Sequence, residues 1–132
     1  LKDFIAQHKS EQAVVSLLTA EVENPSHFGR IVRTSDGGIR IMEKEYITPE
    51  QTNINEVSTG TFCFDRQWFE ELFPIVTPLK KLGEYILPTM FVLADERGAR
   101  THCVKLNDAS EWFGINTIEE LKEADRRKQA LL

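Results

Sequence analysis

Ala13-Val14-Val15-Ser16-Leu17-Leu18-Thr19 is the stretch that decides the fold of this 132-residue chain. Its side chains are apolar except for two small hydroxyl residues. A nearly continuous apolar run of this length is typical of a β-strand that is covered on both faces, because both alternating sets of side chains are then buried. We therefore expect residues 13–19 to form a strand inside a layered domain.

Strand and helix patterns alternate along the chain around this run. Turn residues at 35–38 separate two short alternating segments, 30–33 and 39–42, and the two glycines there can take the positive φ of a tight β-hairpin turn. Capping residues, apolar spacing and glycines predict helices over residues 1–8, after Asp65, over 89–97 and after Thr117, and strands over 59–64 and 101–106. The spacing in the last helix predicts that Leu121 faces inward. The fold class is thus α/β, a mixed sheet with flanking helices and a β-hairpin at one edge.

Composition excludes several classes of protein. Hydrophobic residues make up 41% and charged residues 28% of the chain, which is typical of a globular domain. The net charge of −5 and the lack of a basic stripe argue against a nucleic-acid partner. No apolar run approaches the roughly 18 residues of a membrane span. Cys63 and Cys103 stand alone in apolar segments, so we expect free thiols and a reducing, cytoplasmic location.

Short polar strings occur where predicted strands end or helices begin. They are Phe28-Gly29-Arg30-Ile31, Ile41-Met42-Glu43-Lys44, Glu56-Val57-Ser58-Thr59-Gly60, Gly83-Glu84-Tyr85 and Gly114-Ile115-Asn116-Thr117. Each contains a glycine, a small polar residue or a carboxylate. Ligands of open α/β sheets bind at such edges, where loops and helix N-termini converge. We therefore expect these strings to surround one pocket.

In this order and spacing, the five strings resemble the C-terminal half of sugar-1-phosphate nucleotidyltransferases, closest to the uridyltransferase (pyrophosphorylase) domains of bacterial N-acetylglucosamine-1-phosphate uridyltransferases. The resemblance runs from about residue 13 to residue 124. It implies a Rossmann-like nucleotidyltransferase fold of which residues 1–132 are the C-terminal, sugar-phosphate-binding part. The glycine-rich nucleotide-binding part of the family lies upstream of Leu1, and the chain itself begins inside a predicted helix without an initiator Met.

The resemblance also implies a reaction. A nucleoside triphosphate and a sugar 1-phosphate give a nucleoside diphosphate sugar and pyrophosphate, with Mg²⁺ as cofactor. We expect this activity, close to that of a UDP-N-acetylglucosamine pyrophosphorylase, in the full-length protein, and an inactive fragment for these 132 residues alone. A degenerate, non-catalytic domain with a binding or regulatory role is the alternative, and self-association into a homo-oligomer stays open.

By the same resemblance, the substrate-binding residues are Gly29, Glu43, Ser58, Thr59, Gly60 and Glu84. Glu43 matches a glutamate that accepts hydrogen bonds from sugar hydroxyls; otherwise it is a hairpin charge paired with Lys44 or Arg40. Ser58 replaces an asparagine of the closest relatives, so either a water bridges to the sugar or a different sugar binds.

The remaining matched residues have structural alternatives as well. Thr59 and Gly60 would equally suit a strand entry that needs small residues, and Glu84 would suit the dipole of a following helix. Asn116 matches a ligand of the magnesium ion, although it would also serve as a turn or capping residue. Further departures are Ile86 and Pro88, where the relatives present hydroxyl-bearing residues to the sugar.

Overall fold

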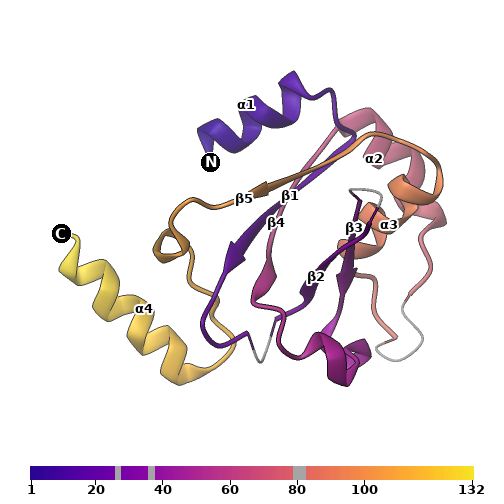
Figure 1. Ribbon diagram of the computed structural model, residues 1–132. Coiled ribbons are helices and arrows are strands. Elements are labelled where there is room, and N and C mark those ends of the chain that lie inside the picture. The colour runs from indigo at the N-terminus through magenta and orange to yellow at the C-terminus, as the bar shows by residue number, and fades with distance from the viewer. Residues whose placement is uncertain (26–27, 36–37, 79–82) are drawn as a thin grey trace.

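The apolar run forms β1 (Val15–Glu21), which lies between two partner strands. It pairs antiparallel with β4 (Glu56–Phe64) and parallel with β5 (Thr101–Lys105). The computed structural model describes residues 1–25, 28–35, 38–78 and 83–132, and its five strands form one mixed sheet in the order β3-β2-β4-β1-β5 (Figure 1). Every β1 residue from Val15 to Ala20 is buried, which confirms the expected doubly covered strand.

Helices cover both faces of β1. The helices are α1 (Lys2–Ser10), α2 (Arg66–Leu72), α3 (Pro88–Glu96) and α4 (Ile118–Ala130), with single 3₁₀ turns at Lys44–Tyr46, Pro49–Gln51, Phe73–Ile75 and Ala109–Glu111. Phe91 of α3 packs with Val15 and Leu17 in the hydrophobic core. On the opposite face, His8 of α1 hydrogen-bonds Ser16, with 2.7 Å between Nδ1 and Oγ. The expected α/β layers are therefore present.

The helix ends follow their local sequence signals. The Asp65 carboxylate accepts a hydrogen bond of 2.8 Å from the Trp68 N–H and caps α2. Thr117 and Glu120 form the expected capping box at the start of α4. Gly98, with φ +63°, follows the last turn of α3 in the left-handed region that glycine tolerates. None of the helices in the described part of the chain is long and apolar enough to cross a membrane.

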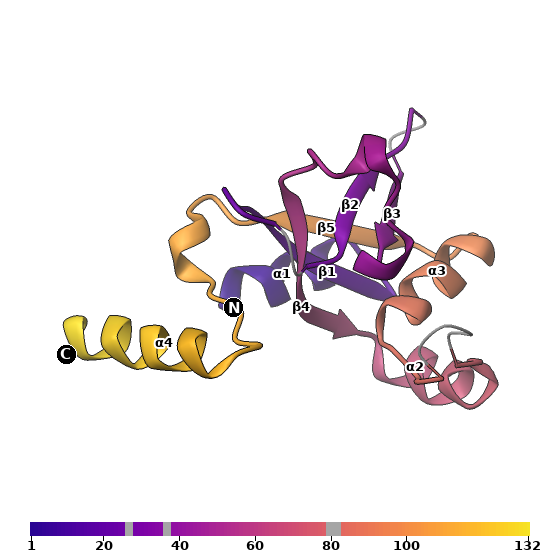
Figure 2. The ribbon, with the colours of Figure 1, turned by 90° about the horizontal axis from the view of Figure 1, so that it is seen from below.

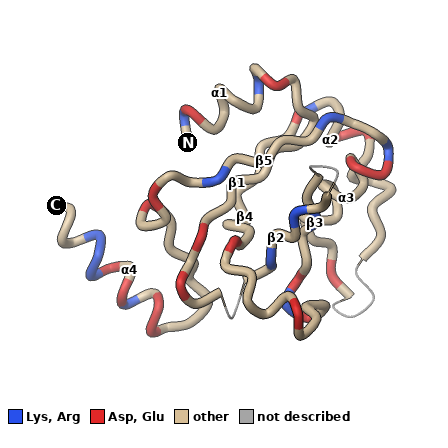
Figure 3. Tube along the Cα trace, viewed as in Figure 1, with Lys and Arg blue, Asp and Glu red and all other residues tan. Residues whose placement is uncertain are grey.

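Two expectations about element boundaries and faces are wrong. β4 begins at Glu56 rather than at residue 59, because Glu56 and Val57 pair with Glu21 and Ala20 of β1. Leu121 does not face inward: its side chain is 49% exposed, and α4 extends away from the sheet with charged residues of both signs along it (Figures 2 and 3). The apolar spacing predicts a helix face, but it does not specify a surface that covers that face.

The hairpin of β2 (Arg30–Arg33) and β3 (Ile39–Met42) forms the edge of the sheet. Two residues of its predicted turn, 36 and 37, lie outside the described residues. Within the described residues β2 joins β4 through one strand pair, Arg30 with Val57. An ion pair adds a second connection: the Arg33 guanidinium donates to both carboxylate oxygens of Glu56, at 2.9 and 2.7 Å. The hairpin is thus attached to the sheet mainly through side chains.

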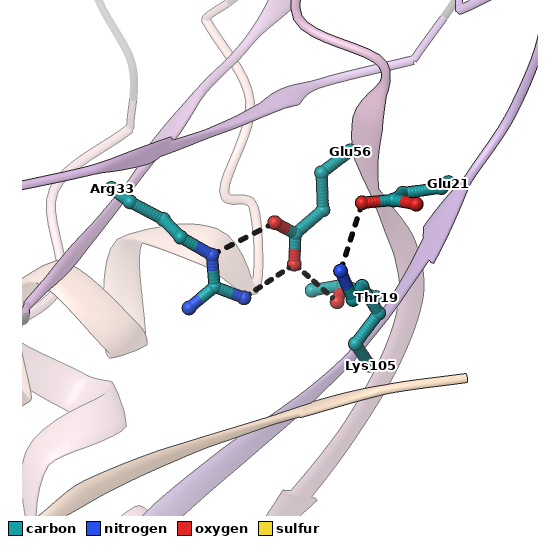
Figure 4. A network of polar contacts seen from close by, with 5 residues as sticks. All are labelled: Thr19, Glu21, Arg33, Glu56 and Lys105. Carbon is teal, nitrogen blue, oxygen red and sulfur yellow. Dashed lines mark hydrogen bonds and ion pairs between the residues drawn. The ribbon is translucent and has the colours of Figure 1, made fainter. Parts of the chain in front are cut away.

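The Glu56 carboxylate is the centre of this polar network (Figure 4). The Thr19 hydroxyl donates to it at 2.7 Å, and beside it Lys105 Nζ lies 2.8 Å from Glu21 Oε1. Burial alone would raise the pKa of Glu56, but the hydrogen bonds from Arg33 and Thr19 hold it below its ordinary value. Glu56 is therefore an ionised, nearly buried carboxylate that connects β2, β4 and β1.

Candidate functional site

A cavity of about 630 Å³ lies where the predicted strings converge. Its lining comes from residues 28–29, 43, 58–60 and 62, 86–88 and 112–116, which are far apart in the sequence. Of the residues expected to bind ligands, the lining includes Gly29, Glu43, Ser58, Thr59, Gly60 and Asn116. Glu84 is exposed and lies outside the lining. The fold thus gathers most of the predicted residues around one hollow.

A β-bulge at Thr59 and Gly60 shapes one part of this cavity. The pairing of β1 with β4 shifts between Leu18, opposite Thr61, and Thr19, opposite Ser58, so Thr59 and Gly60 have no partner on β1. Gly60 has φ +71°, which a side chain would strain. The Thr59 hydroxyl donates to the Leu18 carbonyl at 2.7 Å. The hydroxyl of Thr59 therefore has a structural partner, and the Ser58 hydroxyl accepts the Gly60 N–H at 3.3 Å; all three residues border the hollow.

Gly29 allows the Glu43 carboxylate to lie against the main chain. A Cβ at Gly29 would lie 3.3 Å from the Met42 carbonyl oxygen and 3.5 and 3.6 Å from the two carboxylate oxygens of Glu43. The Gly29 carbonyl in turn accepts a hydrogen bond of 2.9 Å from the Ser58 N–H. The buried Arg30 guanidinium donates to the carbonyls of Pro25 and Phe28 and so ties both residues to the start of β2. These contacts set Glu43 and Ser58 close to one backbone turn.

The electrostatics of Glu43 differ from those of a surface hairpin charge. Burial raises the pKa of its carboxyl, and the neighbouring Glu45 raises it further. The ion pairs found among the described residues do not involve Glu43, so pairing with Lys44 or Arg40 is not observed there. A half-buried carboxylate without a cationic partner is well suited to accept hydrogen bonds from a polar ligand.

Asn116 lies at the cavity on a fixed backbone. Its N–H donates to Glu120 Oε2 at 2.7 Å, and the Thr117 N–H donates to the same oxygen at 2.9 Å. Within the described ranges no group of three or more His, Cys, Asp or Glu side chains is placed to hold a metal ion. Mg²⁺ prefers about six oxygen ligands. The oxygen ligands that the described residues bring to the cavity are therefore too few for a magnesium site, and further ligands would have to come from phosphates, water or other protein segments.

Aromatic residues form a wall that our sequence reasoning missed. The rings of Phe28 and Trp112 meet edge to face, with centroids 4.9 Å apart and planes at 68°. A Cβ at Gly114 would lie only 2.6 Å from Phe28 Cε1, so the glycine makes room for this contact. Arg127 of α4 lies 4.1 Å above the ring of Phe113, which also lines the cavity. The sequence feature that could have indicated this wall is an aromatic residue directly before each glycine, Phe28 before Gly29 and Phe113 before Gly114.

The fold of this chain is similar to that of a solved structure. It superposes with a TM-score of 0.70 on a putative glucose-1-phosphate thymidylyltransferase from Bacillus anthracis that was crystallised in complex with a sucrose. The match covers 95% of this chain and 47% of that chain, at 17% sequence identity. At this identity the likeness concerns the fold, and it confirms the expected nucleotidyltransferase architecture.

Sequence comparison leads further. The chain is 35% identical over 127 residues to the bifunctional protein GlmU of Desulfitobacterium hafniense, a match that covers 95% of this chain and 28% of that protein. It is 34% identical over 123 residues to the bifunctional protein GlmU of Halalkalibacterium halodurans, covering 92% and 27%. The chain thus spans less than a third of the length of these relatives. The model of the nucleotidyl transferase family matches residues 1–130, and the chain belongs to that family.

Proposed function

We propose that the full-length protein transfers a nucleotidyl group from a nucleoside triphosphate to a sugar 1-phosphate, and that residues 1–132 are its sugar-phosphate-binding, C-terminal part. The observation that carries this proposal is the cavity in which Gly29, Glu43, Ser58 and Asn116 meet from four separate segments. Family membership supports the reaction type, and the GlmU relatives favour an activity like that of a UDP-N-acetylglucosamine pyrophosphorylase. The two free thiols suit a cytoplasmic location.

The reaction requires positioning more than covalent chemistry. An oxygen of the sugar phosphate attacks the α-phosphorus of the triphosphate, the new O–P bond forms, and the bond from the α-phosphorus to its bridging oxygen breaks. Pyrophosphate leaves with the bonding electron pair. In-line placement and neutralisation of oxygen charge supply most of the rate acceleration in such transfers. In this proposal, the present chain contributes by holding the sugar so that its phosphate faces the nucleotide.

Each polar residue of the cavity has a role in this proposal. The Glu43 carboxylate accepts hydrogen bonds from sugar hydroxyls, and Gly29 leaves space for this carboxylate beside the main chain. The Ser58 hydroxyl donates or accepts over a shorter reach than an asparagine would, so a bridging water fits there. Mg²⁺, when bound, would neutralise phosphate charge, and Asn116 would be one of its oxygen ligands. Because we infer that the other ligands come from outside the described residues, we expect residues 1–132 alone to be inactive.

The experiment measures pyrophosphate release by the full-length protein over a panel of nucleoside triphosphates and sugar 1-phosphates. We expect release with at least one pair, and a loss of about tenfold or more in kcat/KM for Glu43→Gln, because a charge-assisted hydrogen bond becomes a neutral one. Glu119→Gln changes an exposed glutamate of α4 outside the cavity lining and serves as the control.

The alternative is a degenerate domain that binds sugar nucleotides without turnover. Ile86 and Pro88 favour it, because these apolar side chains line the cavity where hydroxyl-bearing residues were expected. Calorimetric binding of a nucleoside diphosphate sugar, with no pyrophosphate release from any pair, would support the binding domain and reject the enzyme.

A further inference from the structure

The lining of the cavity has two chemically different parts. Glu43, Ser58 and Asn116 present oxygen and nitrogen atoms to the hollow. Residues 86–88, the sequence Ile-Leu-Pro at the start of α3, present only apolar side chains, and Phe62 of β4 lies next to them in the lining. A ligand in this hollow therefore meets hydrogen-bonding groups on some of its atoms and only hydrocarbon on others.

Two main-chain carbonyl groups of residues 86–88 are already engaged in hydrogen bonds. The Ile86 carbonyl accepts the Thr89 N–H at 3.1 Å, and the Leu87 carbonyl accepts the Met90 N–H at 2.9 Å, because these residues begin α3. Pro88 has no N–H group. The carbonyl oxygens are thus occupied by the helix, and the third residue has no donor.

The hydroxyl of Thr89, the residue after Pro88, does not border this cavity. Its oxygen is buried and has no hydrogen-bond partner within the described structure. Thr89 lines a second hollow of about 290 Å³, which Glu43, Ile86 and Pro88 also border, and it is absent from the lining of the first cavity. A sugar hydroxyl packed against the side chains of Ile86 and Pro88 would meet hydrocarbon there instead of a hydrogen-bonding group.

We propose that the cavity selects a deoxygenated sugar 1-phosphate, in which the carbon that faces Ile86 and Pro88 carries hydrogen or a methyl group instead of a hydroxyl. This inference rests on the proposed function, since it specifies the substrate of the same site. The remaining hydroxyls of such a sugar are recognised by Glu43 and Ser58. Ile86 and Pro88 are then specificity-determining residues.

The test measures kcat/KM of the full-length protein for sugar 1-phosphates in matched pairs. Glucose 1-phosphate is paired with its 2-deoxy and 6-deoxy forms, and galactose 1-phosphate with its 6-deoxy form; N-acetylglucosamine 1-phosphate is included as the substrate type suggested by the relatives. Apolar pockets disfavour an added hydroxyl by up to about 100-fold. We expect at least one deoxy sugar to exceed its hydroxylated parent by about tenfold or more.

Substitutions at Ile86 and Pro88 test whether these residues cause the preference for a deoxy sugar. Ile86→Thr with Pro88→Thr supplies two hydroxyls, and it should lower the preference for the deoxy sugar about fivefold or more. Ile86→Thr alone keeps proline at the start of α3 and should shift the preference in the same direction, in case the double variant does not fold. Val92→Thr makes a similar change on α3 outside the cavity and should leave the ratio unchanged.

The outcomes separate the two proposals. Turnover with equal kcat/KM for both members of every pair would overturn the deoxy-sugar inference and leave nucleotidyl transfer intact. A preference that is unchanged in the Ile86→Thr variants would overturn it as well. No pyrophosphate release from any sugar would reject the proposed function and, with it, this inference.

Discussion

The sheet contains two regions that are held together differently. β1 pairs with β4 over seven residue pairs and with β5 over five, and helices cover both of its faces. The hairpin of β2 and β3 joins β4 through one described pair and the hydrogen bond from the Ser58 N–H to the Gly29 carbonyl. It also depends on the Arg33–Glu56 ion pair, on core contacts of Ile31 and Ile41, and on Phe28 packing against Trp112. Gly29 and Glu43 flank the hairpin, so these two candidate binding residues lie on the less firmly attached region, whereas Ser58 and Gly60 lie on β4. Local stability varies in this way in many proteins whose sites lie on mobile elements.

The largest expected effect concerns the firmly held region. Leu17 of β1 is fully buried in the core, so Leu17→Ala removes apolar burial and leaves a cavity. We expect the free energy of unfolding of the 132-residue chain to fall by about 3 kcal/mol, measured by urea denaturation. Leu121→Ala on the exposed side of α4 is the matched control and should change it by less than about 0.5 kcal/mol.

The second-largest expected loss in the free energy of unfolding concerns the contact between Phe28, just before the hairpin, and Trp112 of the cavity wall. Gly114→Ala puts a methyl group against the Phe28 ring, which must then move away from Trp112. We expect a loss of about 1–3 kcal/mol, as for other overpacked sites. Phe28→Leu should relieve the clash, so the double variant should be less destabilised than the sum of the two single variants. Strict additivity in this double-mutant cycle would contradict the contact.

The ion pair between hairpin and sheet should have a smaller effect. Arg33→Met leaves the Glu56 carboxylate, whose side chain is 10% exposed, with the Thr19 hydroxyl as its remaining hydrogen-bond donor in Figure 4. Because Arg33 is itself 54% exposed, we expect a loss of only about 1–2 kcal/mol. Amide hydrogen exchange should accelerate in β2 and β3 more than in β1. Arg66→Met, which breaks the exposed Arg66–Glu70 pair, should change neither quantity measurably.

Acid sensitivity near pH 6 should belong to the firmly held region, whereas the lowered pKa of Glu56 at the hairpin acts only below its ordinary value of 4.5. Burial lowers the pKa of His8 from its ordinary 6.5; Asp65 opposes this, while His102 and Lys9 reinforce it. The unfolded chain therefore takes up a proton more readily than the folded chain, so the free energy of unfolding decreases as the pH falls below about 6.5. Urea denaturation over a pH series should show this slope, and His8→Gln should remove it. A slope that persists in His8→Gln would assign the effect to another group.

Short-range sequence patterns predicted which segments form strands and helices better than they predicted which distant residues those segments contact. The apolar run predicted β1, and the glycines at 37 and 38 predicted the hairpin, because these features act within a few residues. The start of β4 was missed because a charged Glu56 is acceptable inside a sheet only when Arg33, 23 residues away, neutralises it. The bulge at Thr59 and Gly60 depends on the register with β1, which no short-range pattern contains.

The cavity also depends on contacts between distant residues that the sequence did not predict. The resemblance selected residues that the fold brings to one hollow, including Glu43 and Asn116, because their spacing follows strand ends and helix starts. It gave no indication of the contact between Phe28 and Trp112, which are 84 residues apart in sequence (112 − 28). Glu84 was selected by its string alone, and the fold leaves it exposed outside the lining.

The smallest expected effect is an increase, rather than a decrease, in the free energy of unfolding, and it concerns Glu43. Because burial and Glu45 raise the pKa of Glu43, its ionised form destabilises the folded chain at neutral pH. Any stabilisation from its protonated form is present below the ordinary pKa of 4.5 and is lost as the pH rises through the raised pKa. Glu43→Gln should therefore increase the free energy of unfolding at pH 7 by less than about 1 kcal/mol, and the difference should shrink in acid. Urea denaturation at both pH values measures it. A decrease at pH 7 would mean that Glu43 pairs with Lys44 or Arg40 in solution, and its carboxylate would then hold the hairpin rather than a sugar.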